Sequence, residues 1–229
     1  GVTPVAGEVW RPKARGSYPA VAFIGGASAG DDFRALAKLL AEKGVVSLLY
    51  EGRGAGDSSW GSTKADLQTL AGEALAGIQY LQQRPDIQKN NTGLAGFGKG
   101  GWIAPLAASS SREIAFVITI STPSVSSREH AEYDPLPVLL NLRAPVLMLF
   151  GGREDSIAVE KSMTSIATTM REAGKKYFAY RILPNASRDL YTKPYHDSPL
   201  PLLQNLPLAR RFEPEALVAP VGVLASALE

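Results

Sequence analysis

Residues 96–101, Gly-Phe-Gly-Lys-Gly-Gly, decide the fold of this chain. They close a strand-like apolar run at residues 92–97 and open a run of small residues, 100–109, that is typical of a helix packed closely on a sheet. A strand, a tight turn and a helix in this order carry the G-x-S-x-G pattern, in which a strained turn holds a nucleophilic serine above the sheet. The serine position here is Gly98, so the sequence predicts the turn without its nucleophile.

The rest of the chain alternates short apolar runs with longer amphipathic ones. Strands are expected at residues 5–11, 20–24, 45–50, 92–97, 114–120, 145–150 and 177–182, and helices at 31–43, 64–84, 100–109, 159–173 and 213–228. This alternation predicts βαβ units, and therefore a mostly parallel sheet with helices on both faces. No linker or repeat divides the chain, so a single domain over residues 1–229 is expected.

In such a sheet, ligands bind beyond the carboxyl ends of the strands. The loops that line this crevice are expected to follow Ile24, Tyr50, Phe97, Ile120, Phe150 and Ile182. The candidate catalytic and binding residues discussed below lie on these loops. This edge of the sheet is therefore the candidate site.

The composition excludes several kinds of site. The 229 residues include no cysteine, which excludes thiol nucleophiles, thiolate metal sites and disulfides. With only His130 and His196, and with neither a P-loop nor a dinucleotide glycine pattern, no metal and no cofactor is expected. The net charge of +2 and the lack of a basic run argue against nucleic acid. No apolar stretch approaches the roughly 20 residues of a membrane span. The composition leaves the compartment open.

Five segments in chain order point to one known family. Residues 20–28 are an apolar run followed by a Gly-rich loop, and residues 50–58 read Tyr-Glu-Gly-Arg-Gly-Ala-Gly-Asp-Ser. Residues 96–108 carry the glycine turn, 134–155 end in Gly-Arg-Glu-Asp, and 183–190 read Leu-Pro-Asn-Ala-Ser-Arg-Asp-Leu. With these motifs in this order the chain resembles the α/β-hydrolase superfamily, in its bacterial esterase- and peptidase-like branch. The resemblance implies an α/β-hydrolase fold.

The resemblance also assigns the positions of a catalytic triad, whose order in this fold is Ser, then Asp or Glu, then His. On this chain the three positions read Gly98, Asp155 and Arg188. Glycine has no atom with which to attack, and arginine cannot act as a base near neutral pH. The triad is therefore expected to be degenerate, and Asp155 is expected to form an ion pair with Arg188 rather than to act in catalysis.

The resemblance implies that the remaining binding groups of the site belong to the backbone. The usual histidine of the oxyanion loop is replaced by Gly25. The residues that the resemblance implies for binding are Gly25, Gly26, Ala27 and Lys99. An oxyanion hole made of amides near Ala27 and of Lys99 can still bind a carbonyl or an anion. Relatives tend to carry a helical lid where this chain has only residues 121–144, so the lid is expected to be absent or vestigial.

Three functions remain open at this stage. The first is a non-hydrolytic pseudoenzyme that binds a carbonyl-bearing or anionic small molecule, or a protein partner. The second is an enzyme, such as a lyase or cyclase, that reuses the crevice through Asp155, Lys99 or His196. The third is a serine-type ester or peptide hydrolase with a relocated nucleophile, for which the candidates are Ser28, Ser58, Ser121 and Ser124.

Overall fold

A mostly parallel sheet forms the centre of the computed structural model, which describes residues 7–25, 30–50, 67–122, 133–152, 156–183 and 186. Its seven strands within these residues are β1 (Gly7–Trp10), β2 (Tyr18–Ile24), β3 (Val46–Tyr50), β4 (Ile87–Phe97), β5 (Val117–Ile120), β6 (Val146–Gly151) and β7 (Phe178–Leu183). The spatial order is β1-β3-β2-β4-β5-β6-β7. Only the pairing of β1 with β3 is antiparallel among these seven strands. The predicted fold class is confirmed.

The strand order reverses between β2 and β4. The chain runs from β2 outward to β3, and then returns to place β4 on the other side of β2. At such a point the loops that follow the two neighbouring strands diverge to opposite sides of the sheet and leave a crevice between them. This crevice lies where β2 ends at Ile24 and β4 ends at Phe97, the edge that the sequence predicts for the site.

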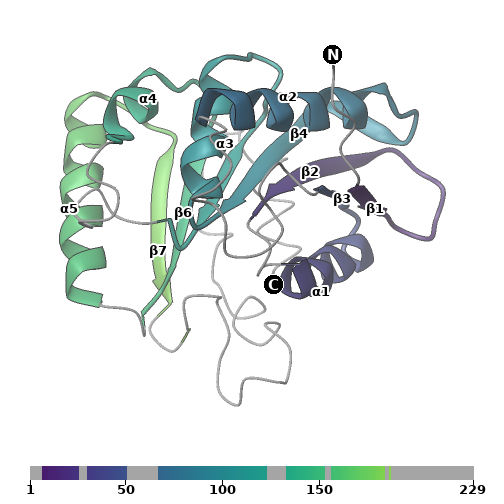
Figure 1. Ribbon diagram of the computed structural model, residues 1–229, viewed down its shortest axis with the longest axis horizontal. Helices are drawn as coiled ribbons and strands as arrows, with labels where there is room; N and C mark the ends of the chain where they lie inside the picture. Colours follow the sequence, from purple (N-terminus) through teal and green to yellow (C-terminus); the bar gives the residue numbers. More distant parts are fainter. Residues whose placement is uncertain are drawn as a thin grey trace.

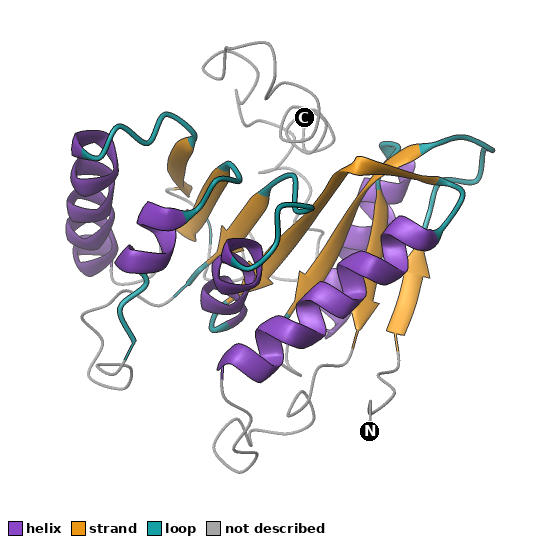
Figure 2. Cartoon of the chain, turned by 90° about the horizontal axis from the view of Figure 1, so that it is seen from above, coloured by secondary structure: helices purple, strands orange, loops and turns teal. Residues whose placement is uncertain are grey.

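Helices cover both faces of the sheet (Figures 1 and 2). They are α1 (Gly30–Glu42), α2 (Leu67–Gln83), α3 (Gly100–Ser109), α4 (Leu136–Asn141) and α5 (Ser156–Glu172). Buried residues of α2 to α5 share one core with one face of the strands, whereas those of α1 share a second core with the opposite face. Strands buried on both faces are uniformly apolar, as in the Val-Leu-Met-Leu-Phe-Gly of β6.

Helix α3 is buried on all sides because its residues are apolar, and several of them are small. Its described side chains from Gly100 to Ala108 are all buried, and the helix contacts α2, β4 and β5. Small residues let the backbone of α3 approach the sheet closely, which fixes the position of the turn at its amino end. The predicted bounds of this helix, residues 100–109, are those observed.

Two elements differ most from the sequence-based expectation, whereas the bounds of the others shift by at most three residues. Strand β4 begins at Ile87 rather than at residue 92, because Ile87 pairs with Tyr18 ahead of an irregularity in the β2–β4 register. Helix α4 was not expected, because Pro135 and Pro137 disfavour a longer helix. The Asp134 Oδ1 nevertheless accepts a hydrogen bond from the Leu136 N–H at 2.9 Å, and this bond stabilises the start of the short helix. The helix expected at residues 213–228 lies outside the described residues.

The connection expected to lack a lid is described only in part. Its helix α4 packs between α3 and α5, with Leu139 buried in the core on the sheet face. This part of the connection therefore does not lie over the carboxyl edge of the sheet. Residues 123–132 are outside the described residues, and the absence of a lid stays a prediction.

Candidate functional site

Gly98 forms the tight turn between β4 and α3. Its φ is 53°, in the left-handed region that glycine adopts without a Cβ clash. The Gly98 N–H donates to the Ile120 carbonyl at 2.9 Å, and the Gly98 carbonyl accepts from the Gly101 N–H at 3.0 Å. The predicted strand-to-helix turn with a positive φ is confirmed. The structure has the geometry of an elbow, with no side chain at its centre.

The glycines that flank Gly98 are required by packing. A Cβ at Gly96 would overlap the carbonyl oxygen of Gly100, and a Cβ at Gly100 would overlap the carbonyl oxygen of Ile24. Backbone atoms cannot move aside as a flexible side chain can. These two contacts hold the first turn of α3 directly against the ends of β2 and β4, so the tight frame of the elbow depends on both glycines.

Ser121 occupies a strained position beside this turn. It follows β5, is 4% exposed and has a φ of 47°, the only positive φ of a non-glycine residue in the described part of the chain. Its N–H donates to the Leu149 carbonyl at 2.8 Å, while the carbonyl of the preceding Ile120 accepts from Gly98. The two left-handed residues thus lie at the ends of neighbouring strands. Strain of this kind concentrates at functional sites.

The segments after β6 and β7 meet at the same edge of the sheet. The Gly152 N–H donates to the Leu183 carbonyl at 2.7 Å, and the Ala186 N–H donates to the same carbonyl at 3.0 Å. Ala186 is fully buried in the core on the α1 face. The backbone of Gly152, shortly before residue 155, is thereby held near that of Ala186, shortly before residue 188.

An aromatic cluster lies beside the end of β2. The Phe33 ring from α1 packs on Phe23 with centroids 5.0 Å apart and edge-on to Phe97 at 6.0 Å. A Cβ at Gly25 would overlap this same Phe33 ring. Phe33 therefore leaves no room for a side chain at Gly25, which gives a physical reason for the glycine at that position. No sequence pattern indicates this contact, because Gly25 follows β2 whereas Phe33 lies on α1.

Trp102 packs in the core of the structure. It is 4% exposed, and its ring lies 5.4 Å from that of Tyr133, centroid to centroid. Burial, and secondarily the neighbouring Asp134, raises the pKa of the Tyr133 hydroxyl. Its burial and this ring contact indicate that Trp102 serves in packing.

Comparisons with known proteins agree with this geometry. Residues 75–173, less than half of the chain, match the sequence model of a family described as BAAT / Acyl-CoA thioester hydrolase C terminal. The esterase Est1E of Butyrivibrio proteoclasticus, solved with ferulic acid bound, shares 17% identity at a TM-score of 0.64, over 81% of this chain and 87% of that one. Dienelactone hydrolase of Anabaena variabilis shares 22% identity at a TM-score of 0.61, over 85% and 86%. The chain has the α/β-hydrolase fold.

A third solved neighbour with this fold is larger. Acylaminoacyl peptidase of Pyrococcus horikoshii matches at a TM-score of 0.64 and 16% identity, over 85% of this chain but 37% of that one. No curated protein matches the sequence.

The structure places Gly98 in the turn between β4 and α3. That this turn is the nucleophile position stays a prediction from the resemblance. Lys99 follows as the first residue before α3, with its carbonyl accepting from the Trp102 N–H at 3.0 Å. Gly25 directly follows β2 and lies beside Phe33. The other expected site residues lie outside the described residues: Gly26, Ala27, Asp155 and Arg188, with the alternatives Ser28, Ser58, Ser124 and His196. The expected Asp155–Arg188 ion pair therefore stays a prediction.

Two further properties of the described residues bear on the site: metal binding and membrane crossing. No group of three or more His, Cys, Asp or Glu side chains is placed to hold a metal ion within these residues. None of the helices in the described ranges has the length and apolar content needed to cross a bilayer.

Proposed function

We propose that this α/β-hydrolase-fold protein does not hydrolyse by the serine mechanism and instead uses its crevice to bind a small molecule with a carbonyl or a negative charge. The observation that carries the proposal is the tight turn at Gly98, which has a φ of 53° and lies where the resemblance puts the nucleophile. The surrounding contacts of Gly96 and Gly100 keep the turn itself intact. The binding frame is thus retained where the attacking atom is missing.

The chemistry at the base position supports the same conclusion. The resemblance places Arg188 where a histidine takes the proton from serine. A guanidinium keeps its proton and its charge up to a pH of about 12, so it cannot accept that proton near neutral pH. Because triad members act as a unit, the loss of one removes most of the rate and the loss of a second adds little.

Backbone donors and charge favour the proposed ligand class. The amide of the residue after the nucleophile, here Lys99, contributes to the oxyanion hole in this fold. Such a hole binds a carbonyl oxygen or an anion without any nucleophile. The names of the family and structures that this chain resembles refer to thioesters, lactones and a bound carboxylic acid, all of which carry a carbonyl group. A guanidinium from Arg188 would add a bidentate partner for a carboxylate. A protein partner remains the alternative occupant.

Probe labelling and turnover test the proposal together. We expect no covalent adduct with a fluorophosphonate, by intact-protein mass spectrometry, and no turnover of p-nitrophenyl butyrate above a heat-denatured control. The matched variant is Gly98→Ser with Arg188→His, which restores both missing groups. A stoichiometric adduct on any serine of the natural chain overturns the proposal.

One observation favours a second candidate, a hydrolase with a relocated nucleophile. Ser121 is buried and strained, and it lies at the strand end next to Gly98. If it attacks, the fluorophosphonate adduct maps to Ser121 and disappears in Ser121→Ala. The Ser109→Ala variant, a serine on the far end of α3, serves as the control and keeps any adduct.

A further inference from the structure

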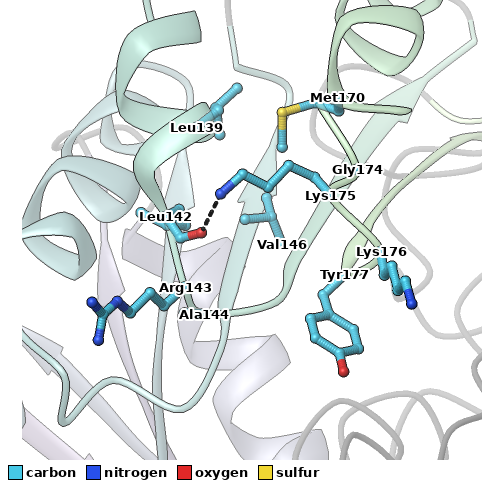
Figure 3. A pocket seen from close by; sticks show the side chains of 10 residues that line it. All are labelled: Leu139, Leu142, Arg143, Ala144, Val146, Met170, Gly174, Lys175, Lys176 and Tyr177. Carbon is cyan, nitrogen blue, oxygen red and sulfur yellow. Dashed lines mark hydrogen bonds between the residues drawn. The ribbon is translucent and has the colours of Figure 1, made fainter. Parts of the chain in front are cut away.

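A second cavity lies at the opposite edge of the sheet, away from the crevice. It has a volume of about 320 Å³ and opens between the ends of α4 and α5, where β6 and β7 begin (Figure 3). This volume is at the lower end of the roughly 300–1,000 Å³ that is typical of small-molecule sites. Its lining residues are Leu139, Leu142, Arg143, Ala144, Val146, Met170, Gly174, Lys175, Lys176 and Tyr177.

The inner wall of this cavity is apolar. Leu139, Leu142, Val146 and Met170 belong to the core shared by α2 to α5, and each is at most 5% exposed. The cavity therefore reaches the hydrophobic core, and an apolar group that enters it leaves water for a hydrocarbon surface. Burial of such a group contributes about 25 cal/mol per Å² of apolar surface removed from water.

The lining carries three cations and no carboxylate. Arg143 and Lys176 are exposed, whereas Lys175 is half-buried, and its side chain extends across the cavity toward Leu142 (Figure 3). The Lys175 Nζ donates to the Leu142 carbonyl at 3.3 Å. That bond uses one of the three N–H donors of the ammonium group. The cavity thus combines an apolar interior with a positive rim.

Lys175 also has an interpretation without a ligand, as a cap for the carboxyl end of α4. Two helix ends face this region, and each contributes at most about half a negative charge. Three formal positive charges therefore exceed the roughly one negative charge of both ends together. Capping alone explains Lys175, but it does not explain why Arg143 and Lys176 join it on a lining without an acidic residue.

The turn after α5 fixes the position of Lys175. Gly174 has a φ of 69°, its N–H donates to the Arg171 carbonyl at 2.9 Å, and the Lys175 N–H donates to the Met170 carbonyl at 2.9 Å. A left-handed glycine with such bonds is a standard helix end. The backbone of Lys175 is therefore held in place, so that less conformational entropy is lost when its side chain orders around a ligand.

We propose that this cavity binds an amphiphilic anion, a short apolar chain or ring that carries one carboxylate or phosphate group. The apolar part lies against Leu139, Leu142, Val146 and Met170, and the charged group lies near Lys175, with Arg143 and Lys176 at the rim. This site is independent of the crevice at Gly98.

Isothermal titration with four probes tests the proposal on the full chain. Octanoate and octyl phosphate carry both features, whereas octanol lacks the charge and inorganic phosphate lacks the chain. We expect saturable binding of octanoate or octyl phosphate that is at least tenfold tighter than that of both controls and that weakens as salt rises. The tighter of the two identifies the preferred charged group. Equal affinity for octanol or for inorganic phosphate, or no saturable binding, overturns the proposal.

Variants then locate the site. Lys175→Met keeps the apolar stem and removes the charge, so we expect about tenfold weaker binding, the effect of losing one charge-assisted hydrogen bond. Arg143→Gln removes the charge of an exposed side chain. It provides a second test of the positive rim if Lys175→Met folds poorly. Ala144→Phe fills the cavity and is expected to abolish binding. Lys38→Met, an exposed lysine of α1, is the control. Unchanged binding in the three cavity variants would mean that the probe binds elsewhere, and would overturn the proposal.

Discussion

At the scale of single residues, the glycines of the elbow differ in what they do. Gly98 is needed for its backbone conformation, whereas Gly96 and Gly100 are needed because any Cβ would meet backbone atoms. A side chain at a left-handed position costs about 1–2 kcal/mol, which a protein can tolerate. An overlap with fixed backbone cannot be relieved locally. The frame of the elbow therefore depends more on its flanking glycines than on the residue at its centre.

We expect Gly100→Ala to lower the free energy of unfolding by about 3 kcal/mol or more, in the range of overpacked core positions. The matched control is Gly44→Ala, since Gly44 has a φ of 87° and open space around its missing Cβ. That substitution is expected to cost about 1 kcal/mol, from the backbone conformation alone. Urea denaturation measures both. A cost at Gly100 no larger than at Gly44 would show that α3 can move away from β2.

The contact between Gly25 and Phe33 makes a second prediction at this scale. Gly25→His introduces the histidine that the resemblance implies for this position, but its Cβ would meet the Phe33 ring. We therefore expect Gly25→His to destabilise the protein by about 2 kcal/mol, and the double variant with Phe33→Ala to cost less than the sum of the two single variants. The coupling energy, measured by a double-mutant cycle in urea, is expected to be about 1 kcal/mol or more. Strict additivity would mean that the two positions do not compete for space.

At the scale of elements, the turn between α2 and β4 is held by a partly buried ion pair. Arg84 Nε and Nη2 donate to the two oxygens of Asp86 at 3.0 and 2.9 Å, and the Asp86 carbonyl accepts from the Tyr18 N–H. The hydrogen bonds from Arg84 hold the pKa of the Asp86 carboxyl below its usual value, against the opposing effect of burial. The pair fixes the start of β4 against β2.

We expect Asp86→Asn to lower the stability by about 1 kcal/mol at pH 7, because the pair is bidentate but still partly solvated. A carboxyl whose pKa is lowered by folding stabilises the protein above its unfolded value, about 3.9, and this contribution is lost as the pH falls through the folded pKa. The difference between natural protein and variant should therefore shrink below a pH of about 4. Thermal unfolding at pH 7 and pH 3 measures it.

The exposed pair of Arg34 and Glu8 is the control for this prediction. Its two side chains are 47% and 46% exposed, and the Glu8 pKa is lowered by the hydrogen bonds from Arg34 and Trp10. Solvent screens such a pair, so Glu8→Gln is expected to change the stability less than Asp86→Asn does. An equal effect would mean that the partial burial of Asp86 is unimportant.

The elements show what a sequence can predict and what it cannot. Each parallel strand ends in apolar residues that are followed by a turn or loop, so the six expected strand ends lie within one residue of the observed ones. The elbow at Gly98 could be predicted because its glycines are local requirements of one turn. By contrast, Ser121 has a φ of 47° that no local residue type indicates, and the exclusion of a side chain at Gly25 comes from Phe33 on another element. These features arise from tertiary packing and become visible only in the structure.

At the scale of the whole molecule, one sheet separates two hydrophobic cores. Leu40 of α1 is 1% exposed in one core, and Leu81 of α2 is fully buried in the other. The strands between them contribute alternate side chains to both cores, as Val21 and Ala22 of β2 do. A substitution in one core is therefore expected to affect the packing of the other core across the sheet. The chain is expected to unfold as a single cooperative unit.

Matched substitutions on the two faces test this expectation. Leu40→Ala and Leu81→Ala remove the same atoms, and each is expected to cost about 2–5 kcal/mol. Because the two cores share the strands β2 to β7, each variant should shift one transition, with the same midpoint by far-UV circular dichroism and by tryptophan fluorescence. The midpoints of the two probes should coincide in both variants as they do in the natural chain. A second transition, or separate midpoints in only one variant, would show that the face covered by α1 unfolds independently of the face covered by α2, and that the sheet does not couple its two cores.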